Sequence, residues 1–141
     1  MALIQIVYVS SLKTLRLESE ISNILESSIR HNKENDITGM LLYAGGNFLQ
    51  VLEGESDRIG ETFQRISIDP RHHNIIDIIN DPVTEREFSQ WSMGFYQLTP
   101  EQIQSFPDSV LFFDFGADPQ SIKARPGLAL SLLRDFRKNC R

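Results

Sequence analysis

The sequence predicts an α+β fold in which one mixed sheet of five strands carries two helices on the same face and further helices follow at the C-terminus. Apolar residues that alternate with a period of two predict the strands, and two stretches with a helical period lie between them. A short turn at Gly45 and Gly46 joins the second and third predicted strands as a hairpin. The 141 residues are enough for one domain with a substantial core.

Each element has its own signal in the sequence. The five predicted strands occupy residues 3–10, 37–43, 47–53, 74–80 and 88–96. The predicted helices occupy about residues 17–32, 55–69 and 127–139, with short amphipathic pieces at 100–104 and 108–115. Pro70 discourages continuation of the second helix, and Asp81 with Pro82 ends the fourth strand. The order β-α-β-β-α-β-β is the ferredoxin-like arrangement with one added strand.

Charge and cysteine content restrict the partners and the compartment. The formal net charge is -5 and no basic stripe occurs, so neither nucleic acid nor an anionic membrane surface is an expected partner. The single cysteine, Cys140, cannot form an internal disulfide, which suits a reducing compartment. The apolar N-terminus lacks the basic region of a secretion signal, and no stretch is long enough to span a membrane. A cytoplasmic protein is therefore expected.

Polar residues stand at positions where the patterns predict an apolar face. Alternation places Gln50 between Phe48 and Leu52 on one side of its strand. A carboxamide buried there costs about 1–3 kcal/mol unless both of its ends find partners. Three further polar residues take inward positions, namely Tyr8 on the first strand and Ser28 and Asn32 at the end of the first helix. Each has an ordinary explanation by itself, but together they predict a polar object shared between the helices and the sheet.

The two helices also offer apolar groups at matching depths. Ile24 and Ile66 could clamp a flat ring, and the amides would satisfy its polar edge, so a planar heteroaromatic ligand fits this composition. Arg65 and the run 69–73 lie at and beyond the end of the second helix. They could bind the outer part of such a ligand, for example a phosphate or ribose. The alternative is that these residues only complement the helix dipole.

At these positions the sequence resembles the BLUF domain, the bacterial sensor of blue light using FAD. The resemblance is carried by Tyr8, by Glu26 to Ser28 with His31 and Asn32, and by residues 38–43, 48–54, 69–73 and 91–93. It extends over about residues 3–98, with motifs on every core element of the predicted fold.

The resemblance implies a flavin between the two helices, with FAD expected and FMN or riboflavin as alternatives. It implies that Tyr8 is the electron and proton donor and that Gln50 bridges the phenol and the flavin. The expected flavin-binding residues are Tyr8, Ile24, Ser28, Asn32, Gln50, Arg65, Ile66, Asp69, Arg71 and His72. Whether Gln50 rotates or tautomerises after light is left open.

The resemblance also implies a route for the signal. Alternation places Trp91 and Met93 on one face of the predicted fifth strand. The resemblance implies that this pair lies near Gln50 and passes a shift to the C-terminal helices, although both could simply fill the core. Residues 1–98 are the expected photosensory domain and 99–141 its helical extension, which is too short for a catalytic domain. A downstream response or regulatory protein and self-association are therefore expected, and catalytic residues are not.

Two other classes of function are alternatives. An enzyme of this fold, such as an acylphosphatase, would need a glycine-rich phosphate loop that the sequence lacks, whereas a flavin-dependent reductase would turn over NAD(P)H. A protein-interaction module without a ligand would be colourless. No metal is expected, because adjacent histidines such as His72 and His73 rarely chelate one ion together.

Overall fold

The computed structural model describes residues 2–12, 17–44, 47–68, 72–99, 101–102 and 126–137. Its elements are β1 (Leu3–Leu12), α1 (Leu17–Glu34), β2 (Thr38–Ala44), β3 (Asn47–Glu55), α2 (Ser56–Ile68), β4 (His72–Pro82), β5 (Gly94–Gln97) and α6 (Pro126–Phe136). Five strands form one sheet in the order β4-β1-β3-β2-β5. All neighbouring strands are antiparallel except β2 and β5, which are parallel. The predicted ferredoxin-like α+β fold with a mixed five-stranded sheet is confirmed.

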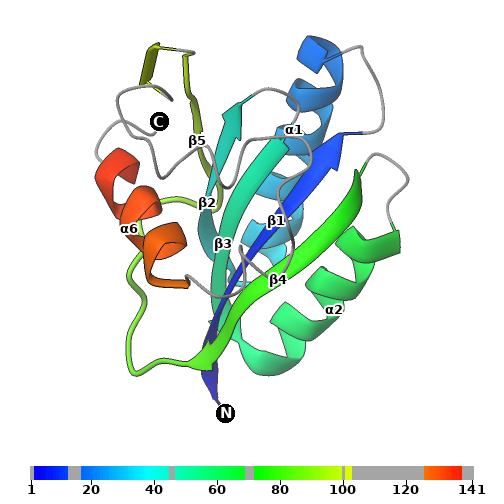
Figure 1. The fold of residues 1–141 in the computed structure, drawn as a ribbon. Coiled ribbons are helices and arrows are strands. Elements are labelled where there is room, and N and C mark those ends of the chain that lie inside the picture. The colour runs from blue at the N-terminus through cyan, green and yellow to red at the C-terminus, as the bar shows by residue number, and fades with distance from the viewer. Residues whose placement is uncertain are drawn as a thin grey trace.

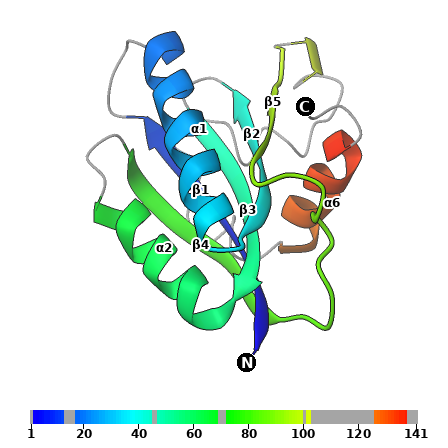
Figure 2. The same cartoon turned by 180° about the vertical axis from the view of Figure 1, so that it is seen from behind.

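The helices form two layers on opposite sides of the sheet. Helices α1 and α2 lie together on one face, and α6 covers the other (Figure 1). Figure 2 shows the same arrangement from behind, with α1 and α2 in front of β1 and β3. Helix α6 docks on the sheet through a buried face that includes Ala129, Leu133 and Phe136.

Alternation along β1 and β3 divides the core into two clusters, as the sequence predicts. On the α1–α2 face, Tyr8, Phe48 and Leu52 are fully buried. On the α6 face, Val7 and Val51 belong to the second cluster. The two strands pair in register, so a residue of β1 and its partner on β3 point to the same side of the sheet.

Strand β4 forms one edge of the sheet and is not a regular strand. Its pairing with β1 has two register shifts, which indicate β-bulges. Asp77, Asp81 and Pro82 are exposed along it. Bulges, charges and proline are features with which natural proteins prevent an edge strand from pairing further.

The fifth strand is much shorter than predicted. Only Gly94–Gln97 pairs with β2, whereas the preceding residues form an irregular connection from β4. The expectation that Trp91 and Met93 share a face of this strand is wrong, because Met93 is buried in the α1–α2 cluster and Trp91 packs against the α6 cluster. Hydrogen bonds to this connection from distant residues hold it in a path that alternation alone could not reveal.

Candidate functional site

The site is built on two neighbouring side chains that lie on adjacent strands and on the same face of the sheet. Tyr8 on β1 and Gln50 on β3 are register partners, and both point toward the helices α1 and α2. The Tyr8 hydroxyl donates a hydrogen bond to Gln50 Oε1, and both side chains are buried. Gln50 Nε2 donates to Met93 Sδ at 3.5 Å. A thioether is a weak acceptor, so the amide end of Gln50 keeps donor capacity for a better partner.

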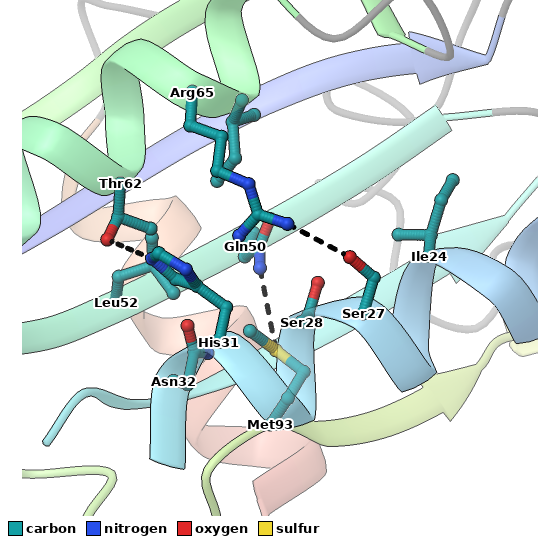
Figure 3. Close-up of a pocket in the computed structure, with 11 residues that line it drawn as sticks. Ile24, Ser27, Ser28, His31, Asn32, Gln50, Leu52, Thr62, Arg65 and Met93 are labelled. Carbon is teal, nitrogen blue, oxygen red and sulfur yellow. Dashed lines mark hydrogen bonds between the residues drawn. The ribbon is translucent and has the colours of Figure 1, made fainter. Parts of the chain in front are cut away.

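Helix α1 supplies the next wall. Asn32 is 2% exposed, and its Nδ2 donates to the backbone carbonyl of Ser92 at 2.7 Å. The side-chain oxygen of Asn32 points toward the space between the helices (Figure 3). Ser28 and Ile24 lie along the same side of α1, one and two turns before Asn32 respectively. This wall therefore offers one apolar side chain and two polar groups.

Helix α2 forms the opposite wall with Thr62, Arg65 and Ile66. Two of the polar contacts between α1 and α2 involve residues that line this space. His31 Nε2 lies 2.8 Å from Thr62 Oγ1, and Arg65 Nη2 donates to Ser27 Oγ at 3.2 Å. Figure 3 shows both contacts, with Gln50 between them. The two helices are thus joined by polar side chains above the Tyr8–Gln50 pair.

Between these walls lies a cavity that has its floor on β3. It has a volume of about 390 Å³, its open mouth included. We call it the helix cavity. Its lining residues are Ile24, Ser27, Ser28, His31, Asn32, Gln50, Leu52, Thr62, Arg65, Ile66 and Met93.

Burial changes the proton affinity of two groups here. Complete burial raises the pKa of Tyr8 well above its ordinary value of 10.0, so the phenol keeps its proton at neutral pH. The pKa of His31 is lowered, first by partial burial and then by the Arg65 guanidinium, against a smaller opposing effect of Glu34 and Glu61. Both groups are therefore neutral hydrogen-bonding groups in the site at neutral pH.

A family model for sensors of blue light using FAD, the BLUF family, matches residues 3–94. The chain belongs to the BLUF family. A BLUF match over these residues includes every strand that contributes to the helix cavity and both of its helices.

Related proteins extend the comparison. The blue light- and temperature-regulated antirepressor BluF of Escherichia coli is 30% identical over 93 residues, which are 66% of this chain and 23% of that protein. Photoactivated adenylate cyclase subunit beta of Euglena longa is 32% identical over 101 residues, 71% of this chain and 12% of the relative. The chain thus spans less than a quarter of the length of these curated relatives. The dark-state structure of the BLUF protein BlrB has a TM-score of 0.71 at 30% identity, covering 92% of this chain and 97% of BlrB.

The helix cavity fits the flavin of the BLUF family. A flavin ring has two apolar faces and an edge of alternating donors and acceptors, and the cavity has Ile24 and Ile66 in opposite helices and amides below them. Within the described part of the chain, Gln50 Nε2 has only a thioether partner, so a ring acceptor would improve its hydrogen bonding. The donor set therefore agrees with the cofactor of the family.

The structure brings most of the predicted flavin-binding residues to one place. Six of them line the cavity, namely Ile24, Ser28, Asn32, Gln50, Arg65 and Ile66. Tyr8 lies behind Gln50 rather than in the cavity wall. Asp69 and Arg71 lie outside the described residues, and of His72 only the backbone pairing with Leu12 is described.

Sequence reasoning did not name five of the lining residues as ligand contacts: Ser27, His31, Leu52, Thr62 and Met93, the last of which it named only for signalling. Helical spacing could have found three of them. Ser27 is three residues after Ile24, His31 is three residues after Ser28, and Thr62 is four residues before Ile66. Each of them therefore shares a face of its helix with a residue that was predicted.

Two further findings concern the described ranges alone. No helix there is both long and apolar enough to cross a bilayer. No cluster of three or more His, Cys, Asp and Glu side chains in those ranges has the proximity needed to hold a metal ion.

Proposed function

We propose that the protein is a blue-light receptor that holds FAD in the helix cavity and uses Tyr8 and Gln50 as its photoactive pair. The observation that carries this proposal is the hydrogen bond from Tyr8 to Gln50 Oε1, together with the weak partner at Gln50 Nε2. The two ends of a carboxamide are almost equal in shape but opposite in hydrogen bonding. FMN and riboflavin are the alternative ligands.

The residues of the two helices have separate roles in this proposal. Ile24 and Ile66 cover the two faces of the ring, while Asn32 and Ser28 bind its polar edge. Arg65 binds the outer part of the cofactor, as do the three further predicted residues Asp69, Arg71 and His72. The inward side chains of both helices and the cationic mouth of the cavity support this division.

When bound, a flavin supplies blue-light absorption and an excited state that can oxidise a phenol. Tyr8 is the electron and proton donor, and its proton already lies in the hydrogen bond to Gln50 Oε1. Transfer of that proton, together with the electron, to the bound flavin would remove the donor that fixes the Gln50 oxygen. The amide could then rotate or tautomerise, and the electron and proton would return to Tyr8. The hydrogen-bond pattern that Gln50 presents to the cavity then reverses, and we expect a small red shift of the absorption.

The output of this change is a protein contact rather than a reaction. Met93 touches Gln50 directly, and Trp91, two residues earlier, packs on the α6 side. We propose that the signal passes through these residues to α6 and to a response or regulatory protein. The names of the relatives, an antirepressor and a photoactivated cyclase, support control of a second activity. Residues 99–141 act as a helical extension of the sensor, and self-association remains a prediction.

The first test is the spectrum of the purified protein before and after blue light. We expect a yellow protein with a reversible red shift. Gln50→Leu should keep the flavin and lose the shift, because leucine has neither donor nor acceptor. Gln64→Leu, the same change at an exposed position of α2 outside the cavity, is the control and should behave like the wild type. A normal light cycle in Gln50→Leu would refute the assignment, and turnover of NAD(P)H would indicate a reductase.

A further inference from the structure

Glu53 is a buried charge that the proposed photochemistry does not use. It lies on β3, three residues after Gln50, and its side chain is 0% exposed on the opposite face of the sheet. Its carboxylate accepts four hydrogen bonds at 2.6–3.0 Å. The donors are Gln5 Nε2, the backbone N–H of Phe88 and the backbone N–H of Glu87, which reaches both oxygens.

The donors around this carboxylate are all neutral. Among the described residues, no cation lies within ion-pair distance of it. A buried carboxylate without a cation is retained only where its hydrogen bonds are nearly complete, and each of those bonds is stronger and more directional than one between neutral groups. Glu53 therefore fixes the backbone at Glu87 and Phe88 to β3 in one position.

Glu87 and Phe88 belong to the irregular connection of residues 83–93 between β4 and β5. On one side this connection reaches the helix cavity, because the Ser92 carbonyl binds Asn32 and Met93 Sδ binds Gln50. Arg86 adds a second attachment, to the turn that follows α1. It donates to the backbone oxygen of Asp36 at 2.7 Å. One end of the connection thus touches the groups that would respond to light.

The same connection also holds α6. Arg134 binds the Glu87 carboxylate with two hydrogen bonds, at 2.5 and 3.2 Å. Arg137 donates to the Glu87 backbone oxygen and lies 5.7 Å from the centre of the Phe88 ring. The Phe88 side chain is fully buried in the α6 cluster. The connection 83–93 therefore links the helix cavity on one face of the sheet to α6 on the other. The residues that make these contacts are Arg86, Glu87, Phe88, Ser92 and Met93.

We propose that Glu53 is a positioning residue that couples the two faces. It holds the connection 83–93 in a position where Met93 contacts Gln50 and Glu87 forms an ion pair with Arg134. A change at Gln50 then reaches α6 through the Glu87–Arg134 ion pair. This inference rests on the proposed function, because it names the route by which the Tyr8–Gln50 pair acts on the C-terminal helix.

The test compares light and dark hydrogen exchange of the α6 amides in the intact flavin-loaded protein, with the absorption shift recorded in the same samples. In the wild type we expect faster exchange in α6 under light. Glu87→Gln should keep the full red shift and its recovery rate but lose the light-dependent exchange. The variant keeps both backbone donors to Glu53, and the pair that it breaks is partly exposed, so the fold should persist. Glu26→Gln breaks the exposed Glu26–Arg30 pair and is the matched control.

Two further variants separate coupling from simple destabilisation. The charge swap Glu87→Arg with Arg134→Glu should restore the light response that Glu87→Gln loses. Glu53→Gln replaces one carboxylate oxygen with an N–H2 group that faces the donors of Gln5, Glu87 and Phe88, so the connection should loosen. We expect the light response of α6 to disappear and the dark recovery rate to change on the order of tenfold. The size of the red shift should not change, since Tyr8 and Gln50 remain.

The outcomes distinguish this inference from the function on which it rests. A wild type without a red shift would refute the proposed function itself. A wild-type red shift without a light response in α6, or a normal α6 response in Glu87→Gln, would overturn the coupling route and leave the light receptor standing.

Discussion

The two faces of the central strands are built from the same backbone and contain opposite kinds of residues. Toward α6, β1 and β3 present Val7, Leu49 and Val51, which close with the α6 leucines into an apolar cluster. Toward α1 and α2, the same strands present Tyr8 and Gln50 beside large apolar side chains. On the α6 side the apolar cluster needs no partner, and the buried Glu53 beside it has its hydrogen-bond donors within the protein. The other side is lined with polar groups that still need a partner, such as Gln50 Nε2.

This difference separates stability from function on a single sheet. Apolar burial on the α6 side contributes free energy of folding without regard to a ligand. The polar groups on the cavity side contribute less, because each buried hydrogen bond adds only about 0.5–1.5 kcal/mol to stability. Their arrangement is instead suited to binding and to exchange of hydrogen-bond partners. Variants on the two faces should therefore have different consequences.

The largest effect on stability is expected on the α6 face. Leu133→Ala removes a fully buried side chain and should lower the free energy of unfolding by about 2–5 kcal/mol. Urea denaturation measures this loss. The red shift of the surviving folded protein should be normal, because Leu133 does not line the helix cavity. Leu128→Ala, at a half-buried position of the same helix, is the control and should cost less. Loss of the shift in Leu133→Ala would contradict the separation of the two faces.

A smaller effect on stability and a complete effect on function are expected for Tyr8→Phe. The change leaves Gln50 Oε1 without the Tyr8 donor and should cost about 1–3 kcal/mol. It also removes the proposed electron and proton donor, so the light-induced shift should vanish, as difference spectra would reveal. Tyr96→Phe is the matched control, because Tyr96 stacks on Phe136 on the α6 side. A normal shift in Tyr8→Phe would refute the role of the phenol.

The smallest effect concerns pH. The imidazole of His31 titrates near 6.5 in the unfolded chain and at lower pH in the folded protein, because burial and Arg65 lower its pKa. Between these two values the unfolded chain binds more protons, so stability falls as the pH drops below about 6.5. His31→Gln should make this part of the stability profile flatter, measured as urea midpoints at several pH values. The effect is small because the site is partly exposed. An unchanged slope would show that His31 does not contribute.

The strands of the two faces could be predicted because their signal is local. Residues of β1 and β3 alternate strictly, and this alone fixed which of Tyr8, Val9 and Gln50 share a side. The helical period did the same for Ile24, Asn32 and Ile66. The bounds of α1 and α2 were also predicted to within a few residues, although Asp69 at the end of the second helix lies outside the described residues.

What could not be predicted depends on contacts between distant parts of the chain. Residues 88–96 alternate like a strand, but Glu53 binds the backbone at Phe88 and Asn32 binds it at Ser92, so only Gly94–Gln97 joins the sheet. Because residues 83–93 follow this irregular path, Trp91 and Met93 lie on opposite faces of the sheet. No local pattern predicts that Glu53 is buried, since its three hydrogen-bond donors are 34 to 48 residues away in the sequence.

The irregular edge strand β4 should reduce aggregation of the protein at high concentration. Its bulges and its exposed Asp77, Asp81 and Pro82 interrupt the row of backbone groups that another chain could join. Copies of the protein are thereby discouraged from stacking into a continuous sheet across this edge, which is how many β-rich proteins begin to aggregate. If copies of the protein associate, we expect them to do so through surfaces other than this edge.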